Sequence, residues 1–110
     1  MEELRAALLA LHKAVLEVER RQLERVHGRL QNAEFLQIVS DPVRYGWLKP
    51  FTALILALDD PEHEGDVVEE ARELLLPPKS ETPFGRRYLS LMQREPALVV
   101  EHRAVTRLLG

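Results

Sequence analysis

Histidines and carboxylates are the groups in this sequence that could bind a metal ion or transfer a proton, since the chain has four histidines, eighteen acidic residues and no cysteine. The stretch ERVH places Glu24 and His27 three residues apart, as in the Glu-x-x-His element of carboxylate-bridged di-iron bundles. Such a site needs two of these elements and two further glutamates. No second Glu-x-x-His is present, because Val99 precedes His102 at that spacing. We therefore predict no di-iron site and interpret Glu24 and His27 as neighbours at a helix end.

The acidic stretch DDPEHEGDVVEE, residues 59–70, imitates a calcium-binding loop between two helices. When the loop is counted from Asp60, its twelfth position, where a glutamate should bind the ion through both oxygens, is Ala71. The stretch is therefore predicted to be a solvated acidic linker, whose carboxylates favour the start of the next helix. Weak metal binding by His63 with Glu62 or Asp66 is the alternative.

The sequence offers little for nucleophilic catalysis. Its serines and threonines are Ser40, Ser80, Ser90, Thr52, Thr82 and Thr106. None lies in a recognisable nucleophile elbow, and the five glycines are too scattered to form a phosphate-binding loop. We expect a protein that is not an enzyme, with no catalytic residue, no cofactor and no metal site.

The stretch SDPVRYGWLKPF, residues 40–51 and here named the corner segment, gathers the single tryptophan, one of two tyrosines and two of the seven prolines. In one interpretation its prolines end and restart helices while Trp47 closes the end of the core. In the other, Arg44, Tyr45, Trp47 and Phe51 form the rim of a ligand or partner site, since Trp, Tyr and Arg are enriched in binding hot spots. The sequence leaves both interpretations open.

The elements that would position these residues are helices, because a 3.6-residue apolar period dominates and no segment alternates over strand length. We predict a single all-α domain over residues 1–110, a bundle of five to six helices with a long N-terminal helix. The predicted helices cover about residues 2–27, 33–40, 49–59, 66–76 and 82–95, and Pro96 either kinks the last one or starts a sixth that ends at Leu109. Asp41 and Thr82 each precede a proline, as an N-cap does. The helix at 49–59 is apolar nearly all round and is expected to be central.

The first helix carries two apolar stripes. One contains Leu4, Leu8, Leu11, Val15 and Val18, and the other repeats every seven residues at Leu9, Leu16 and Leu23. Between them lies what we name the polar file, Arg5, His12 and Glu19, also seven apart. Either the helix packs between two neighbours of its own bundle, or the second stripe meets a second copy of the chain, as in a coiled coil. In the second case the dimer interface is Leu9, His12, Leu16, Glu19 and Leu23.

Three motifs, RVHGRL at residues 25–30, FLQIVSDP at 35–42 and WLKPFTALI at 47–55, resemble those of a group of small bacterial all-helical proteins of unassigned function. That group carries HGR, DP and WLRP-like motifs, and Lys49 stands here where the group has arginine. The resemblance covers roughly residues 5–60. It implies that the three segments form one unit, and it carries over no activity, cofactor or catalytic residue.

Charge and composition narrow the class of partner. The net charge of −3 gives no general attraction to nucleic acid or to an anionic membrane, and no apolar run approaches the roughly 18 residues of a membrane span. Residues 59–73 hold eight acids and one arginine, whereas residues 81–110 hold five arginines and three acids. The lack of cysteine fits a reducing cytoplasm, and the bias toward Glu, Arg and Leu is typical of thermophilic proteins. We expect a cytoplasmic protein with no nucleic-acid or membrane partner.

These observations favour a non-enzymatic interaction or scaffold module that forms a homodimer and binds a protein partner of unknown identity. The first helix and the corner segment are the expected surfaces. The alternative is a small-molecule carrier or sensor, in which an apolar pocket near residues 44–55 holds the ligand and His12, His27 or His102 orients it.

Overall fold

The computed structural model describes residues 2–110, and all its regular elements within that range are helices. In chain order they are α1 (Glu2–His27), α2 (Asn32–Val39), α3 (Pro42–Tyr45), the 3-10 helix η1 (Gly46–Leu48), α4 (Lys49–Ala57), α5 (Val67–Leu75), α6 (Pro83–Arg94) and α7 (Pro96–Leu109). The prediction of an all-α bundle with a long N-terminal helix is confirmed. No helix of the described chain is long and apolar enough to cross a membrane.

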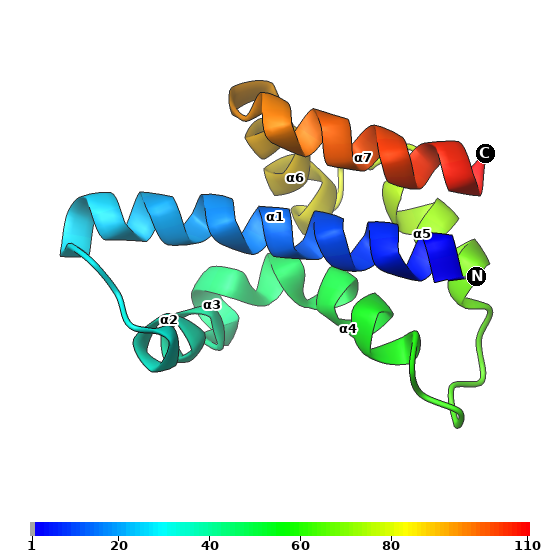
Figure 1. The fold of residues 1–110 in the computed structure, drawn as a ribbon, viewed down its shortest axis with the longest axis horizontal. Helices are drawn as coiled ribbons and strands as arrows, with labels where there is room; N and C mark the ends of the chain where they lie inside the picture. The colour runs from blue at the N-terminus through cyan, green and yellow to red at the C-terminus, as the bar shows by residue number, and fades with distance from the viewer. Residues whose placement is uncertain (1) are drawn as a thin grey trace.

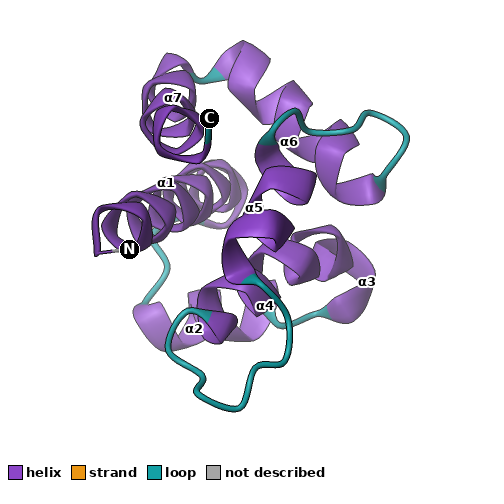
Figure 2. Ribbon diagram, turned by 90° about the vertical axis from the view of Figure 1, so that its right-hand side faces the viewer, coloured by secondary structure: helices purple, strands orange, loops and turns teal. Residues whose placement is uncertain are grey.

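The long helix α1 is the axis of the molecule. It runs along the longest dimension, with α7 on one side and the α3–α4 segment on the opposite side (Figure 1). Seen from its N-terminal end, α1 has α7, α5 and α4 around it and leaves one side to solvent (Figure 2). The expectation that the helix at 49–59 is central is therefore wrong. Helix α4 covers one side of α1, and its outer face includes Leu56, which is 70% exposed.

Local capping signals set most helix ends. Gly28 has φ 77°, the left-handed conformation that glycine adopts readily when it follows a helix. The carboxylate of Asp41 accepts from the backbone N–H of Val43 at 2.9 Å, and the hydroxyl of Thr82 accepts from that of Gly85 at 3.0 Å. Both predicted N-caps are therefore confirmed. Of the two alternatives for Pro96, the structure has the separate helix α7.

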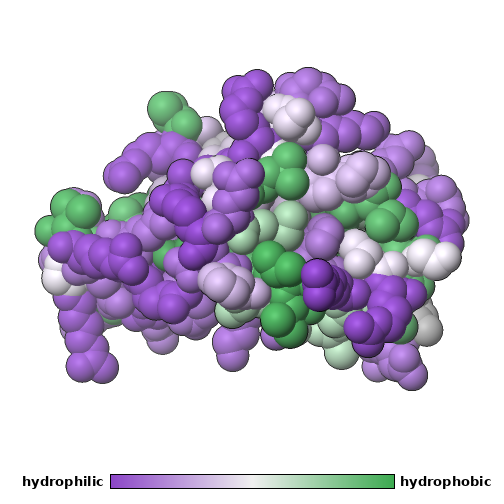
Figure 3. All heavy atoms as spheres, turned by 90° about the horizontal axis from the view of Figure 1, so that it is seen from above, coloured by the Kyte–Doolittle hydropathy of each residue, from purple (hydrophilic) through white to green (hydrophobic). Residues whose placement is uncertain are grey.

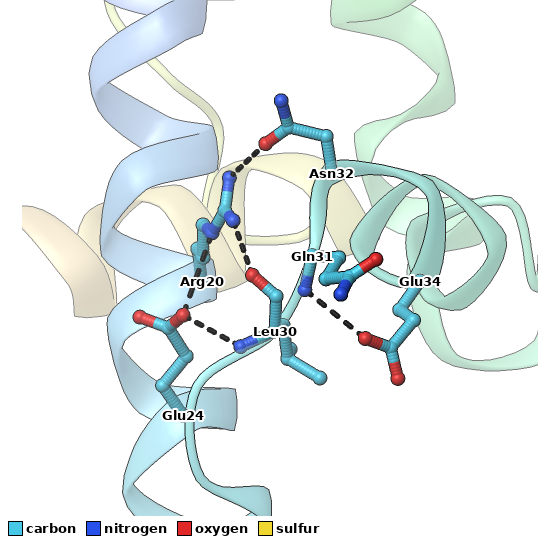
Figure 4. A network of polar contacts seen from close by, with 6 residues as sticks. All are labelled: Arg20, Glu24, Leu30, Gln31, Asn32 and Glu34. Carbon is cyan, nitrogen blue, oxygen red and sulfur yellow. Dashed lines mark hydrogen bonds and ion pairs between the residues drawn. The ribbon is translucent and has the colours of Figure 1, made fainter.

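A polar network fixes the connection between α1 and α2 (Figure 4). The guanidinium of Arg20 donates to Asn32 Oδ1 at 2.8 Å and to the carbonyl of Leu30. The carboxylate of Glu24 accepts from the Leu30 N–H at 2.9 Å, and Glu34 accepts from the N–H of residue 31 at 3.1 Å. Glu24 therefore works as a helix-end group, as expected, and the network holds α2 beside the end of α1.

The buried side chains form a large core cluster and a small one. The large cluster lies where α1, α4, α5, α6 and α7 meet, and the small one contains Leu23, Leu30, Phe35 and Tyr45. Leu16 and Trp47 are partly buried and pack against both clusters. Trp47 therefore lies at the junction of the two cores, in agreement with the interpretation of the corner segment as a structural corner.

The polar file lies on a seam between α1 and the antiparallel segment formed by α3, η1 and α4. Two of its residues pair with that segment, His12 with Thr52 and Glu19 with Tyr45, and Arg5 pairs with Asp59, two residues past the end of α4. The three partners are also seven residues apart, so two seven-residue repeats face each other in opposite directions. The interpretation of α1 as a helix packed between neighbours of its own bundle is confirmed for this file.

The dimer interface predicted on α1 does not fit the structure. Glu19 and Leu23 are buried within the chain, at 3% and 6% exposure, and Leu16 packs between the two core clusters. His12 is half-buried against α4. Only Leu9, which is 36% exposed, still presents its side chain to solvent. Leu16, Glu19 and Leu23 therefore make their contacts inside the chain.

The face of the molecule on the α7 side is mostly hydrophilic, with separate hydrophobic patches (Figure 3). The large apolar residues that are most exposed lie on other elements, Val43 on α3 at 90% and Val26 on α1 at 78%. Val43 belongs to the corner segment, and Val26 is next to the last residue of α1. Leu56 on α4 and Val100 on α7 are also exposed, at 70% and 67%, so exposed apolar side chains are spread over several elements.

The close approach of the segment before α6 to Gly85 gives a stability test. A Cβ at Gly85 would lie 1.9 Å from the Lys79 carbonyl oxygen, whereas a Cβ at Gly46 would meet no atom within 4 Å. We expect Gly85→Ala to lower the free energy of unfolding by about 1–3 kcal/mol, measured by chemical denaturation. Gly46→Ala is the control and should change it by at most about 1 kcal/mol, since Gly46 already has helical angles. Equal effects of the two substitutions would contradict the close approach.

Candidate functional site

The corner segment distributes its four candidate residues between surface and core. Arg44 is exposed, Tyr45 is buried, and Trp47 is half-buried. Phe51 has no exposed surface, because it lies between the His12 ring at 5.1 Å and the Phe84 ring at 5.8 Å. The prediction that Phe51 contributes to a binding rim is therefore corrected: it is a core residue, and the other three remain candidates.

Arg44, Tyr45 and Trp47 meet residues of α1 and α6 around an open hollow of about 480 Å³, here named the basic hollow. Its lining consists of Glu19, Gln22, Leu23, Val26, Arg44, Tyr45, Trp47 and Arg87. Two of these residues are arginines, and the one carboxylate is buried and already paired. The hollow therefore combines aromatic and aliphatic walls with spare hydrogen-bond donors.

The electrostatic centre of the basic hollow is the pair formed by Glu19 and Arg87. One terminal nitrogen of Arg87 donates to Glu19 Oε1 at 2.9 Å and to Gln22 Oε1 at 3.4 Å. The Arg87 guanidinium also lies 5.8 Å from the centre of the Trp47 ring, within the range of a cation–π contact. A buried carboxylate is tolerable only when it is paired, so Arg87 makes the burial of Glu19 possible.

Tyr45 completes this arrangement. Its hydroxyl lies 3.5 Å from Glu19 Oε2, a long contact in which the tyrosine donates. Burial first, and then the nearby Glu19 carboxylate, raise the pKa of Tyr45, so the hydroxyl keeps its proton at neutral pH. Both oxygens of Glu19 therefore have a donor, Oε1 from Arg87 and Oε2 from Tyr45.

A second concave surface lies beside Trp47 and is here named the apolar groove. It has a volume of about 490 Å³ and is formed by η1, α4, α5 and the segment that leads into α6. Its apolar residues are Trp47, Pro50, Ala53, Leu54, Leu74, Pro83 and Phe84, and its charged or titratable residues are His63, Glu70, Glu73 and Lys79. The alternative prediction of an apolar pocket near residues 44–55 thus corresponds to a groove that the structure contains.

The histidines do not lie where the ligand-carrier prediction needed them. His12 Nε2 pairs with the Thr52 hydroxyl at 3.1 Å, and His102 Nδ1 pairs with the Tyr88 hydroxyl at 2.8 Å. His27 is exposed at the end of α1. None of the three lines the apolar groove, so their predicted role in orienting a ligand there is corrected. The histidine at the groove is His63.

His63 interacts with a carboxylate other than the two that the sequence suggested. Its Nε2 lies 2.8 Å from Glu70 Oε2, whereas Glu62 and Asp66 were its partners in the alternative metal-binding interpretation. Asp66 instead caps α5 by accepting from the Val68 N–H at 3.0 Å. Across residues 2–110, no group of three or more metal-ligating side chains is close enough to hold an ion.

Sequence reasoning missed Arg87, Glu19 and Gln22 as parts of the hollow. The sequence did contain an indication for Glu19, because a carboxylate that repeats with a polar file on a buried face needs a cationic partner. Arg87 had none, since it is one of several arginines in its segment. Comparisons with protein-family models, with curated proteins and with solved structures found no match, so the resemblance to the small bacterial group stays a prediction.

Removing Arg87 should test the buried pair. We expect Arg87→Met to lower the free energy of unfolding by about 3 kcal/mol, because it leaves the Glu19 carboxylate buried without a cation. Arg86→Met, at an exposed neighbouring position, is the matched control and should have little effect. Adding Glu19→Gln to Arg87→Met should recover part of the loss. Denaturant unfolding measures all four proteins, and equal losses for the two arginines would show that the pair contributes nothing.

The two paired histidines predict a loss of stability in mild acid. Burial lowers the pKa of both His12 and His102 below the ordinary value near 6.5. The unfolded chain therefore binds more protons than the folded one as the pH falls below about 6.5, and stability that is present above that pH is lost below it. The free energy of unfolding, measured between pH 7.5 and 5, should fall less in His12→Gln/His102→Gln than in the wild type. His27→Gln is the exposed control, and a slope unchanged by the double substitution would contradict the prediction.

Proposed function

We propose that the protein is a non-enzymatic helical interaction module that self-associates, and that the basic hollow is its binding surface. The observation that carries this proposal is the meeting of Arg44, Trp47 and Arg87 at an open hollow, next to the exposed Val26. Tryptophan and arginine around a partly apolar depression have the composition of a protein-binding hot spot. The lack of cysteine supports a cytoplasmic location for this module.

The charges of the hollow favour an acidic occupant. Arg87 uses one terminal nitrogen for Glu19 and Gln22, which leaves its other N–H groups directed elsewhere. Arg44 is exposed and forms no ion pair with any residue of the described chain. Since Glu19 offsets only one of the two guanidinium groups, the hollow carries an unbalanced positive charge. A partner surface with carboxylates beside an apolar group would complement it.

The chain itself contains a suitable surface in the acidic loop, residues 59–66, which joins α4 to α5. Glu62 and Glu64 in this loop are exposed. The loop lies near the N-terminal end of α1, whereas α2 and α3 lie near its C-terminal end (Figure 1). We propose that a two-fold axis across the long dimension brings the acidic loop of each copy to the basic hollow of the other. Both contacts would form at once, as an isologous dimer requires.

A charge-swap experiment tests this dimer. Arg44→Glu alone and Glu62→Arg/Glu64→Arg alone should each weaken self-association about tenfold, because like charges then meet at both contacts. An equal mixture of the two variants should form a heterodimer near wild-type strength, since each contact regains opposite charges. Native mass spectrometry and sedimentation over a concentration series at low salt measure this, because salt screens such contacts.

Three results would contradict the proposal. A wild type that stays monomeric at all concentrations would exclude self-association. A dimer that both variants form as strongly as the wild type would place the interface elsewhere. Variants that fail to combine in the mixture would exclude the pairing of the hollow with the loop.

A second candidate function is the binding of a small molecule, as in a carrier or sensor. The apolar groove favours it, because a volume of about 490 Å³ lies in the range of small-molecule sites, which are mostly apolar with a few polar groups. Trp47 is the one lining residue that the groove shares with the basic hollow. The two candidate functions therefore use different surfaces and can be tested separately.

A further inference from the structure

The floor of the apolar groove is aromatic and aliphatic. The Trp47 and Phe84 rings lie 6.3 Å apart with 31° between their planes, and Leu54 is buried beside them. Phe84 stacks in turn on Tyr88 at 5.1 Å, which anchors this floor in the main core. The floor therefore offers a fixed apolar surface with aromatic faces, to which both aliphatic chains and cations are attracted.

One wall of the groove is acidic. Its charged or titratable residues are Glu70 and Glu73 on α5, His63 before α5, and Lys79 on the opposite rim. Glu70 is held by His63 at 2.8 Å, and Glu73 is exposed and forms no ion pair with other residues in the range 2–110. The segment 59–73, which supplies this wall, has eight acids and one arginine. Besides His63, which pairs with Glu70, Lys79 is the only basic side chain among the residues that line the groove.

We propose that the apolar groove binds a small amphiphilic molecule with an apolar body and one positively charged group, such as a primary amine. The apolar body lies on Trp47 and Phe84, and the cation lies toward Glu70 and Glu73. A carboxylate in the same position would face like charges, so an anionic amphiphile of equal length binds more weakly. This inference deepens the second candidate function and rests on it, and it does not depend on self-association.

The sequence provides a built-in reporter, because Trp47 is the single tryptophan and lines the groove. The probes are octylammonium, octanol and octanoate, which share an apolar chain and differ in charge. Titration of the full chain with each, below the concentration at which the probe aggregates, should shift Trp47 emission. We expect octylammonium to bind about fivefold more tightly than octanol, and octanoate more weakly than both.

Two variants assign the effect to the groove and to its charge. Glu73→Lys should weaken octylammonium about fivefold and strengthen octanoate, whereas Glu17→Lys makes the same change of net charge at an exposed position of α1 outside the groove and should change neither. Ala53→Phe, at an exposed groove residue, should fill the groove and weaken all three probes. Urea unfolding confirms that each variant is folded.

Each contrary result overturns a defined part of the proposal. Equal binding of the three probes, or equal effects of Glu73→Lys and Glu17→Lys, would overturn the preference for a cation while leaving a small-molecule site. Binding that survives Ala53→Phe would place the probes outside the groove. No Trp47 response to any probe would overturn both the site and the carrier function. The proposed dimer is tested separately, by sedimentation, and this result would not affect it.

Discussion

The polar seam between α1 and the antiparallel α3–α4 segment is the constraint on which the rest of the structure depends. The seam consists of three pairs, Arg5 with Asp59, His12 with Thr52 and Glu19 with Tyr45. On each side of the seam, successive residues are seven positions apart. An α-helix drifts only about 20° per seven residues, which keeps the file on one seam over two repeats. The seam passes from solvent to interior: the pair at Arg5 is exposed, the pair at His12 is half-buried, and Glu19 is buried. Only the buried end needs a counter-charge from a third element, and Arg87 of α6 supplies it.

The buried end of the seam also fixes Trp47. Because Arg87 must reach Glu19, its guanidinium lies over the indole ring, and the ring is held at the junction of the two core clusters. Trp47 then borders the basic hollow and the apolar groove together. Arg44 and Arg87 give the hollow positive charge, whereas Glu70 and Glu73 of α5 give the groove negative charge. One aromatic residue thus separates two concave surfaces of opposite charge.

Local physics predicted much of this architecture from the sequence. The caps at Asp41 and Thr82 and the long first helix depend on neighbours within a few residues, so the sequence predicted them. The polar file could be recognised as a seam, but its partners could not, because their alignment depends on where the chain turns. The groove depends on the Lys79 backbone crossing Gly85, a contact that no sequence pattern announces. The apolar run at 49–59 led to the wrong prediction of a central helix for a related reason. Composition does not show which side of a helix stays uncovered, and Leu56 faces solvent.

The two interpretations of the corner segment, structural corner and binding site, are therefore compatible. Phe51 belongs wholly to the core and Arg44 wholly to the surface, while Trp47 belongs to both. A side chain held between two core clusters has already lost its rotamer freedom during folding. A ligand or partner that contacts it meets no further ordering cost at that residue, which is the advantage of a preorganised site. The packing that makes Trp47 a structural residue thus also makes it a suitable wall for a binding site. The charges around the basic hollow and the apolar groove then determine which partner or ligand each surface prefers.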